Sequence, residues 1–254
     1  MASNQKLGDD QWTKLLSFLR ACPKVYVGQE ANCRRFIAGC LWIMRTGAQW
    51  RELPERYGKW NSVYQRFAHW SDGGVWEALH THFVDDPDME ELILDSTVIR
   101  AHPCAAGAPK KRGGQEDQAL GRSRGGFSTK IHVGVDGLGN PLRLILTGGE
   151  RHAITQAEDL IDGYEFGCLI ADKSYDSDDF IDVIHDQAAE PVIPPRSNRT
   201  EKREYDKHLY KERHLVECFI NKIKHFRRIF SRFDKLAHRY FAFLCLAATL
   251  IWLR

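Results

Sequence analysis

Residues 92–99 read Leu-Ile-Leu-Asp-Ser-Thr-Val-Ile, an apolar and β-branched run with a single charge at Asp95. This composition predicts a strand inside a sheet. A carboxylate in such a strand is costly unless it faces a cleft or meets a partner, and a divalent cation is one such partner. Asp95 is therefore a candidate metal ligand, although a lone aspartate at this place can also be an ordinary residue at a strand end.

The segments after Asp95 predict the rest of a mixed sheet. The runs at 128–136 and 142–146 flank a turn at Gly139, which makes a meander of three strands. Further elements are expected in this order: a helix at 155–161, a strand at 168–172, a helix at 177–187, a strand at 191–194, a basic helix from about Asp206 and an apolar helix ending at Leu253. This is the element order of the RNase H-like fold. We therefore expect an α/β, RNase H-like catalytic domain over 89–254, with a mixed five-stranded sheet and flanking helices.

A second candidate ligand, Asp172, ends the apolar strand predicted at 168–172. In the strand order of this fold the first and fourth strands are neighbours. Asp95 and Asp172 are therefore expected to lie close together, which makes a shared role more probable for the pair than for either residue alone.

A third carboxylate, Glu217, lies in the predicted basic helix. At about 100° per residue, the side chains of Tyr210, Arg213 and Lys224 share one stripe of that helix with Glu217. The opposite side is apolar and can pack on the sheet, with Leu215, Val216, Phe219 and Ile223. The alternative is an exposed helix in which Arg213 and Glu217 form a weak ion pair.

Three carboxylates suit metal-dependent phosphoryl transfer, because Mg²⁺ and Mn²⁺ prefer oxygen ligands. Two such ions are expected. The chain also has eleven histidines, which raises the question of zinc. His80 and His82 are one residue apart and His208 and His214 lie six apart, and neither pair has a convincing zinc spacing. We therefore expect no catalytic zinc.

The first 88 residues predict a small all-α domain. Helices are expected from Asp9 or Asp10 to Cys22, from Ala31 to Thr46 and from about Asn61. Residues 1–71 carry eleven Lys or Arg against five Asp or Glu. A basic three-helix unit favours binding to the DNA ends, and the alternative is a helical cap that only packs on the catalytic domain.

Residues 101–127 predict a basic loop that is mobile until a partner orders it. The segment is rich in glycine and small residues, and it is long for a plain hairpin. Its basic residues are Lys110, Lys111, Arg112, Arg122 and Arg124. DNA is the preferred partner, and the alternative is a disordered surface loop.

Composition excludes several classes of protein. The seven cysteines form no Cys-x-x-Cys pair, which suits neither a disulfide framework nor a zinc finger. The amino terminus has no signal-peptide pattern. The long apolar run at 241–253 has thirteen residues, too few to cross a bilayer. We expect a cytoplasmic protein with no membrane partner.

Four ordered blocks of the chain resemble the DDE transposases of bacterial insertion sequences. Tyr210, Arg213, Glu217 and Lys224 match the pattern Y-x2-R-x3-E-x6-K that marks one group of them. The segments LILDSTVIRAH at 92–102 and LIADKSYDSDDF at 169–180 are similar to the two aspartate strands of the family. The stretch GRSRGGFSTKIHV and the carboxyl-terminal sequence are also typical. Ser174 departs from the usual glycine, and Leu215 from a commonly polar residue.

The resemblance implies DNA cleavage at the ends of an insertion sequence and transfer of the freed 3′-hydroxyl to target DNA. It implies that Asp95, Asp172 and Glu217 are the catalytic metal ligands. Double-stranded DNA is the implied partner, as terminal inverted repeats and as target, bound by a homodimer or a larger assembly. The residues expected to contact DNA are Tyr210, Arg213, Lys224, Arg122, Arg124, Lys130, Arg227 and Arg228.

Two other functions stay open from the sequence. One is a DNA-binding protein of transposase descent that no longer catalyses, and the other is a host RNase H-like nuclease. Inverted repeats bracketing the gene would favour transposition over both.

Overall fold

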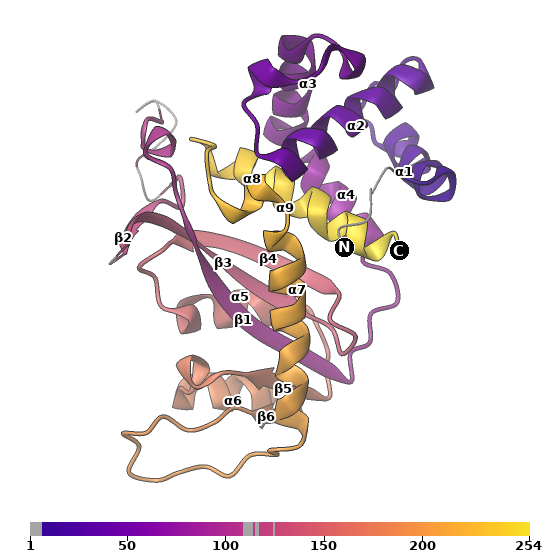
Figure 1. Ribbon diagram of the computed structural model, residues 1–254. Helices are drawn as coiled ribbons and strands as arrows, with labels where there is room; N and C mark the ends of the chain where they lie inside the picture. The colour runs from indigo at the N-terminus through magenta and orange to yellow at the C-terminus, as the bar shows by residue number, and fades with distance from the viewer. Residues whose placement is uncertain (1–6, 109–113, 115–116, 124) are drawn as a thin grey trace.

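The computed structural model describes residues 7–108, 114, 117–123 and 125–254. These residues form a mixed sheet with helices on both faces and a helical layer at one end (Figure 1). The strands are β1 (Glu91–Arg100), β2 (Gly121–Ser123), β3 (Gly126–Val135), β4 (Pro141–Gly148), β5 (Cys168–Ala171) and β6 (Glu190–Val192). The predicted α/β class is confirmed.

The pairing of the strands gives the RNase H-like order. β3 is antiparallel to β1 on one side and to β4 and β2 on the other. β1 is parallel to β5, and β5 is parallel to β6. The first and fourth predicted strands are therefore neighbours, as expected. The predicted number of five strands was wrong, because the three-residue strand β2 adds a sixth.

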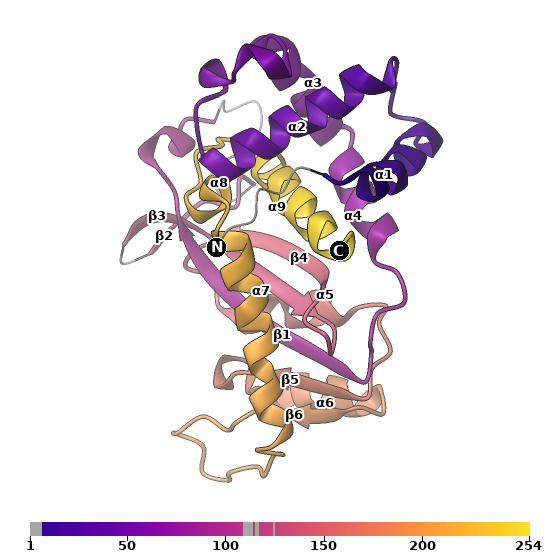
Figure 2. The same ribbon diagram turned by 45° about the vertical axis from the view of Figure 1, so that its right-hand side comes forward.

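Two hydrophobic clusters cover the two faces of the sheet. Successive side chains of a strand point to opposite faces, so Ile93 belongs to one cluster and its neighbours Leu92 and Leu94 to the other. On the Ile93 face lie α7 (His214–Lys224), α8 (Arg227–Phe230) and α9 (Ala237–Trp252). On the other face lie α5 (Ala157–Ile161) and α6 (Asp178–Asp186) (Figures 1 and 2).

The helical layer consists of α1 (Asp9–Ala21), α2 (Glu30–Thr46), α3 (Trp60–Asp72) and α4 (Val75–Phe83). The sequence predicted the first three. It missed α4, which starts directly after α3 because Gly74 takes a left-handed conformation with a φ of 70°. The predicted boundary at residue 88 lies in the link between α4 and β1.

The carboxyl-terminal helix α9 lies between this layer and the sheet (Figure 2). Phe243 of α9 stacks on Phe67 of α3 with ring centroids 4.5 Å apart, and Trp50 lies beside both rings. The apolar run of α9 is therefore buried inside the protein. No helix within the described ranges is long and apolar enough to cross a membrane.

The segment predicted as a mobile loop, 101–127, contains regular structure toward both of its ends. A 3-10 helix spans Pro103–Ala106, and Gln118, Ala119 and Leu120 are buried before β2. Arg232 fixes this part of the chain, because its fully buried side chain donates to the Ala119 carbonyl at 2.9 Å. Of the basic residues expected in the loop, four lie outside the described residues: Lys110, Lys111, Arg112 and Arg124.

Arg232 has no carboxylate partner in the described structure but is surrounded by oxygen acceptors. Its side chain donates to Thr129 Oγ1 at 2.6 Å and to the carbonyl of Asp234 at 3.0 Å. Burial lowers the pKa of this guanidinium. The planar fork of an arginine can reach several acceptors at once, which an ammonium cannot do.

We expect Arg232→Lys to lower the free energy of unfolding by about 2–5 kcal/mol, because it leaves buried acceptors unpaired. Urea unfolding followed by circular dichroism measures the change. Arg122→Lys is the control, since Arg122 is exposed on β2 and its replacement should cost less than about 0.5 kcal/mol. Equal stability of the two variants would show that the acceptors around Arg232 do not require a guanidinium.

Candidate active site

Asp95 and Asp172 lie side by side because β1 and β5 are parallel and in register. Leu94 pairs with Ala171, and the two aspartates are the next residue on each strand. The side chain of Asp95 is only 16% exposed. Burial raises the pKa of Asp95, and the charge of Asp172 raises it further. Two effects that lower this pKa rank below burial and above the charge of Asp172: the Ser96 N–H, which donates to Asp95 Oδ1 at 2.7 Å, and the charge of Arg213.

Asp172 also caps the 3-10 helix Lys173–Tyr175 that follows β5. Its Oδ1 accepts the Ser174 N–H at 2.8 Å and the Ser174 hydroxyl. Ser174 stands where the resemblance led us to expect glycine. The structure therefore gives this departure a local role, because the extra hydroxyl holds one oxygen of Asp172.

Glu217 lies on α7, which crosses the sheet on the Ile93 face (Figure 1). The buried side of α7 packs on the sheet through Val216, Phe219, Ile220 and Ile223. Glu217 lies on the other side of the helix with 49% of its side chain exposed. It is connected to Asp95 through Arg213, whose Nη1 donates to Asp95 Oδ2 at 2.9 Å and whose Nη2 donates to Glu217 Oε1.

Arg213 thus neutralises two of the three carboxylates. Burial alone would lower the pKa of its guanidinium, but the charges of Asp95 and Glu217 outweigh burial and raise it. The Arg213–Glu217 ion pair, which was the alternative from the sequence, is present. Only 21% of the Arg213 side chain is exposed, so the arginine is mostly covered rather than solvated. Arg213 therefore belongs to the carboxylate site.

The three carboxylates do not form a closed metal-binding group. Over the described part of the chain, no three His, Cys, Asp or Glu side chains are placed to hold one metal ion. The donor set still suits a hard divalent cation, because Asp95 and Asp172 repel each other and both offer carboxylate oxygens. The residues therefore fit such a cation by their chemistry.

The prediction that Tyr210, Arg213, Glu217 and Lys224 share one stripe of an α-helix was wrong for the first two residues. Residues Leu209–Arg213 form a 3-10 helix, and α7 starts only at His214. Tyr210 lies in this 3-10 segment, with its ring edge-on to that of Tyr205 at 5.5 Å. Lys224 is half-buried at the last position of α7. The regular spacing of about 100° per residue therefore holds from Glu217 to Lys224 and not across Tyr210 and Arg213.

Four other described residues expected to contact DNA have different surroundings. Arg122 is exposed over the Phe127 ring, and Arg227 is exposed at the start of α8. Lys130 is half-buried and donates to the Arg151 carbonyl. Arg228 is buried, and its Nε and Nη2 donate to both oxygens of Asp234 at 3.0 and 2.7 Å. Because Asp234 neutralises the charge of Arg228 in this buried ion pair, we remove Arg228 from the residues proposed to contact DNA.

The sequence reasoning missed an ion-pair cluster beside Asp172. The side chain of Asp176 is 1% exposed and accepts from Arg196 N at 2.7 Å, Arg199 Nε at 2.6 Å and Arg203 Nη1 at 2.9 Å. Asp178 accepts from the same two arginine side chains. We name Asp176, Asp178, Arg199 and Arg203 the acidic clasp. An acidic run at 176–179 and a basic run at 196–203 are the signal from which this pairing could have been suggested.

The acidic clasp fixes the long segment that leads from β6 into Tyr210 and Arg213. This segment, 193–208, contains no helix or strand. Its arginines attach it to the turn that follows Asp172. The position of Arg213 between the carboxylates therefore depends on chain geometry on both sides, through α7 and through the clasp.

Comparison with known proteins agrees with this geometry. The family described as "Transposase DDE domain" matches residues 86–252, and the family described as "Putative transposase of IS4/5 family" matches residues 7–80. The chain belongs to the DDE transposases of insertion sequences. Members of this family are enzymes that cleave and transfer DNA strands.

Two of the relatives of this transposase are named as insertion-sequence transposases, and a third is uncharacterized. The "Putative transposase for insertion sequence element IS6501" of Brucella ovis is 40% identical over 50% of this chain and 100% of its own. The corresponding IS402 protein of Burkholderia cepacia is 34% identical over 48% of this chain and 62% of its own. The "Uncharacterized protein y4sN" of Sinorhizobium fredii is 38% identical over 44% of this chain and 90% of its own.

We expect Asp176→Asn to release the segment at 193–208, because a neutral amide cannot hold two buried arginine contacts. Trypsin should then cut at Arg199 or Arg203 about tenfold faster at pH 7, as loss of about 1.4 kcal/mol of local stability implies. Mass spectrometry of the first fragments locates the cuts. Asp186→Asn, an exposed change at the end of α6, is the control and should leave the rate unchanged.

The same segment should also be released by acid. Burial alone would raise the pKa of Asp176, but the hydrogen bonds and charges of Arg199, Arg196 and Arg203 lower it. A lowered pKa means that the contact stabilises the fold above the ordinary aspartate range and is lost only as the pH falls through the lowered value. Pepsin cleavage in 193–208 that began above that ordinary range would contradict this assignment.

Proposed function

We propose that this transposase cuts DNA at the ends of its insertion sequence and joins the freed 3′-hydroxyl to target DNA at Asp95, Asp172 and Glu217. The observation that carries the proposal is the parallel register of β1 and β5, which sets two partly buried carboxylates side by side. Glu217 is linked to Asp95 through Arg213. This assigns the three residues one shared task.

Asp95, Asp172 and Glu217 would hold two Mg²⁺ or Mn²⁺ ions. When bound, such ions activate the attacking water or 3′-hydroxyl and stabilise the departing 3′-oxygen. The side chains of Asp95 and Glu217 must first exchange Arg213 for the cations, since its guanidinium now occupies one oxygen of each. Once released, that guanidinium is well suited to grip a phosphate beside the carboxylates.

The proposed partner is double-stranded DNA, as terminal inverted repeats and as target. Arg213, Tyr210 and Lys224 would contact it beside the carboxylates, and Arg122, Lys130 and Arg227 would extend the contact. The helical layer at 1–88 would bind the ends. Because both ends must be brought together for transposition, we propose a homodimer or larger assembly on DNA.

We expect Asp95→Asn, Asp172→Asn and Glu217→Gln each to abolish cleavage of a duplex carrying the terminal inverted repeat. Loss of a metal ligand removes transition-state stabilisation, while the basic surfaces that supply affinity remain. Gel assays of cleavage and anisotropy titrations of binding separate the two effects. Glu212→Gln is a matched control in the same segment and should leave cleavage unchanged. Near wild-type cleavage by any one of the three variants would remove that residue from the proposed site.

Metal binding gives a second readout that does not require catalysis. Mn²⁺ binding, followed by paramagnetic resonance of the free ion, should be seen in the wild type and lost in Asp95→Asn. Mg²⁺ or Mn²⁺ should support cleavage, whereas Zn²⁺ alone should not, because carboxylates form a hard oxygen site. Cleavage that survives EDTA would overturn the proposed metal dependence.

We expect Lys224→Ala to weaken binding of the end duplex and to reduce cleavage. If Lys224 neutralises one phosphate, the slope of log affinity against log salt should become shallower by about 0.9. Titrations at several salt concentrations measure this slope. Lys222→Ala is the matched control, because Lys222 is an exposed lysine of the same helix that points away from the Glu217 side. Identical slopes for the two variants would return Lys224 to a solvated role.

A further inference from the structure

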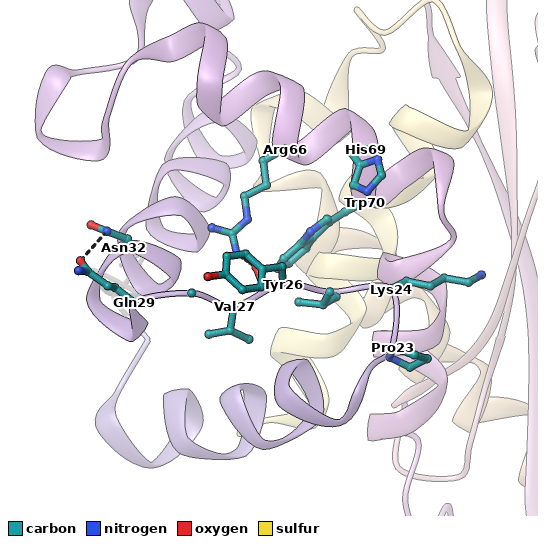
Figure 3. Close-up of a pocket in the computed structure, with 11 residues that line it drawn as sticks. Pro23, Lys24, Tyr26, Val27, Gln29, Asn32, Arg66, His69 and Trp70 are labelled. Carbon is teal, nitrogen blue, oxygen red and sulfur yellow. Dashed lines mark hydrogen bonds between the residues drawn. The ribbon is translucent and has the colours of Figure 1, made fainter.

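A second site lies in the helical layer, away from the carboxylates. A pocket of about 760 Å³ opens between the α1–α2 connection, residues 23–29, and helix α3 (Figure 3). In both ribbon views α1–α3 lie at one end of the molecule and β5 and β6 at the other (Figures 1 and 2). A ligand in this pocket is therefore held outside the proposed cleavage site.

One wall of the pocket is an exposed aromatic ring. Tyr26 is 87% exposed, the highest value among the exposed large hydrophobic side chains of the described structure. The neighbouring Gly28 has a φ of +62°, and a Cβ at this position would lie 3.2 Å from the Tyr26 ring. Only glycine meets both conditions without strain. The ring is thus held over bare backbone, with a free face available for stacking.

The floor of the pocket is positively charged. Arg66 Nη2 donates to the Tyr26 carbonyl at 3.0 Å, and its guanidinium lies over the rings of Phe36 and Trp70 at 4.6 and 5.0 Å. These contacts fix the charge without a carboxylate partner among the described residues. Lys24 and His69 also line the pocket, and no acidic residue does within the described ranges. The pocket therefore favours an anion.

A polar edge completes the lining. Asn32 Nδ2 donates to Gln29 Oε1 at 3.0 Å, and Arg35 Nη2 donates to Asn32 Oδ1 at 2.8 Å. The Gln29 amide lies beside Asn32 at the outer edge of this lining (Figure 3). A single nucleotide has a base, a phosphate and a polar base edge. An aromatic face, a fixed cation and amide donors can bind these three parts in turn.

We propose that this pocket takes one nucleotide of DNA whose base is unstacked from its neighbours. The base lies on the Tyr26 ring, and its phosphate lies toward Arg66. The volume is within the range of small-ligand sites. This inference rests on the proposed function only in taking DNA as the partner. It adds the place in the helical layer where the DNA is bound and the contacts that bind it.

The probe is a fluorescein-labelled oligonucleotide of eight thymidines, which requires no knowledge of the element's ends. Tyr26→Leu keeps apolar bulk but loses the stacking face, and should weaken binding about 5- to 100-fold, the loss measured for one stacked base. Tyr26→Phe keeps the ring and should bind within about twofold of the wild type. Leu138→Ala, an exposed apolar change in the turn between β3 and β4, is the control and should bind like the wild type.

A second probe locates the unstacked base in an end-containing duplex. With 2-aminopurine substituted at successive positions, one position should brighten on binding, and that change should be reduced in Tyr26→Leu. Unchanged binding of both probes by Tyr26→Leu would overturn the proposal. A change in sedimentation of Tyr26→Leu without DNA, with normal oligonucleotide binding, would overturn it in favour of a contact between two copies of the chain.

Failure of the pocket and failure of the proposed function have different signatures. If the carboxylate site is inactive but the pocket is correct, thymidine binding still depends on the Tyr26 ring while cleavage is absent. If the pocket is wrong but the catalytic proposal is correct, Tyr26→Leu cleaves and binds like the wild type, and Asp95→Asn still abolishes cleavage.

Discussion

The parallel pairing of β1 and β5, which brings Asp95 and Asp172 together, is the constraint on which this site depends. The hydrogen-bonded register of β1 and β5 leaves Asp95 and Asp172 no freedom to move apart. A charge at this depth is tolerated only with a partner of opposite sign, and Arg213 supplies that partner from a separate element. Because Arg213 also binds Glu217, one guanidinium connects the Glu217 side of α7 with β1.

Placing that guanidinium requires support from both directions along the chain. On one side, the apolar face of α7 packs between sheet and C-terminal helices and fixes Glu217 within the helix. On the other side, the acidic clasp holds the segment 193–208, which has no helix or strand. Without these ion pairs, the chain before the 3-10 helix Leu209–Arg213 would have no fixed path. The site combines side chains from β1, from the end of β5 and from α7. Its geometry depends on the buried face of α7 and on the buried carboxylate of Asp176.

The parts of this fold that local patterns dictate were predictable. Alternation and β-branching determined β1, β3 and β5, and the strand order then brought Asp95 and Asp172 together. Long-range partners determined the rest. Arg228 and Arg232 look like exposed bases in the sequence. In the structure Arg228 is paired with Asp234, six residues away, and Arg232 donates to the Ala119 carbonyl, 113 residues away. The 3-10 turn at Tyr210 and the strand β2 were missed for a related reason, since each is short and is stabilised by tertiary contacts rather than by propensity.

Arg213 and Arg66 show two ways to keep a cation in place with different consequences for DNA. Arg213 is held by carboxylates, so its charge is neutralised until another cation takes those oxygens. Arg66 is held by aromatic rings and a carbonyl, contacts that leave its charge uncompensated. A phosphate would therefore find attraction at the helical layer at once, whereas attraction at the carboxylates would follow the exchange at Arg213. This difference orders the two contacts: binding through the helical layer can precede assembly of the cleavage site, so DNA can be held before it can be cut.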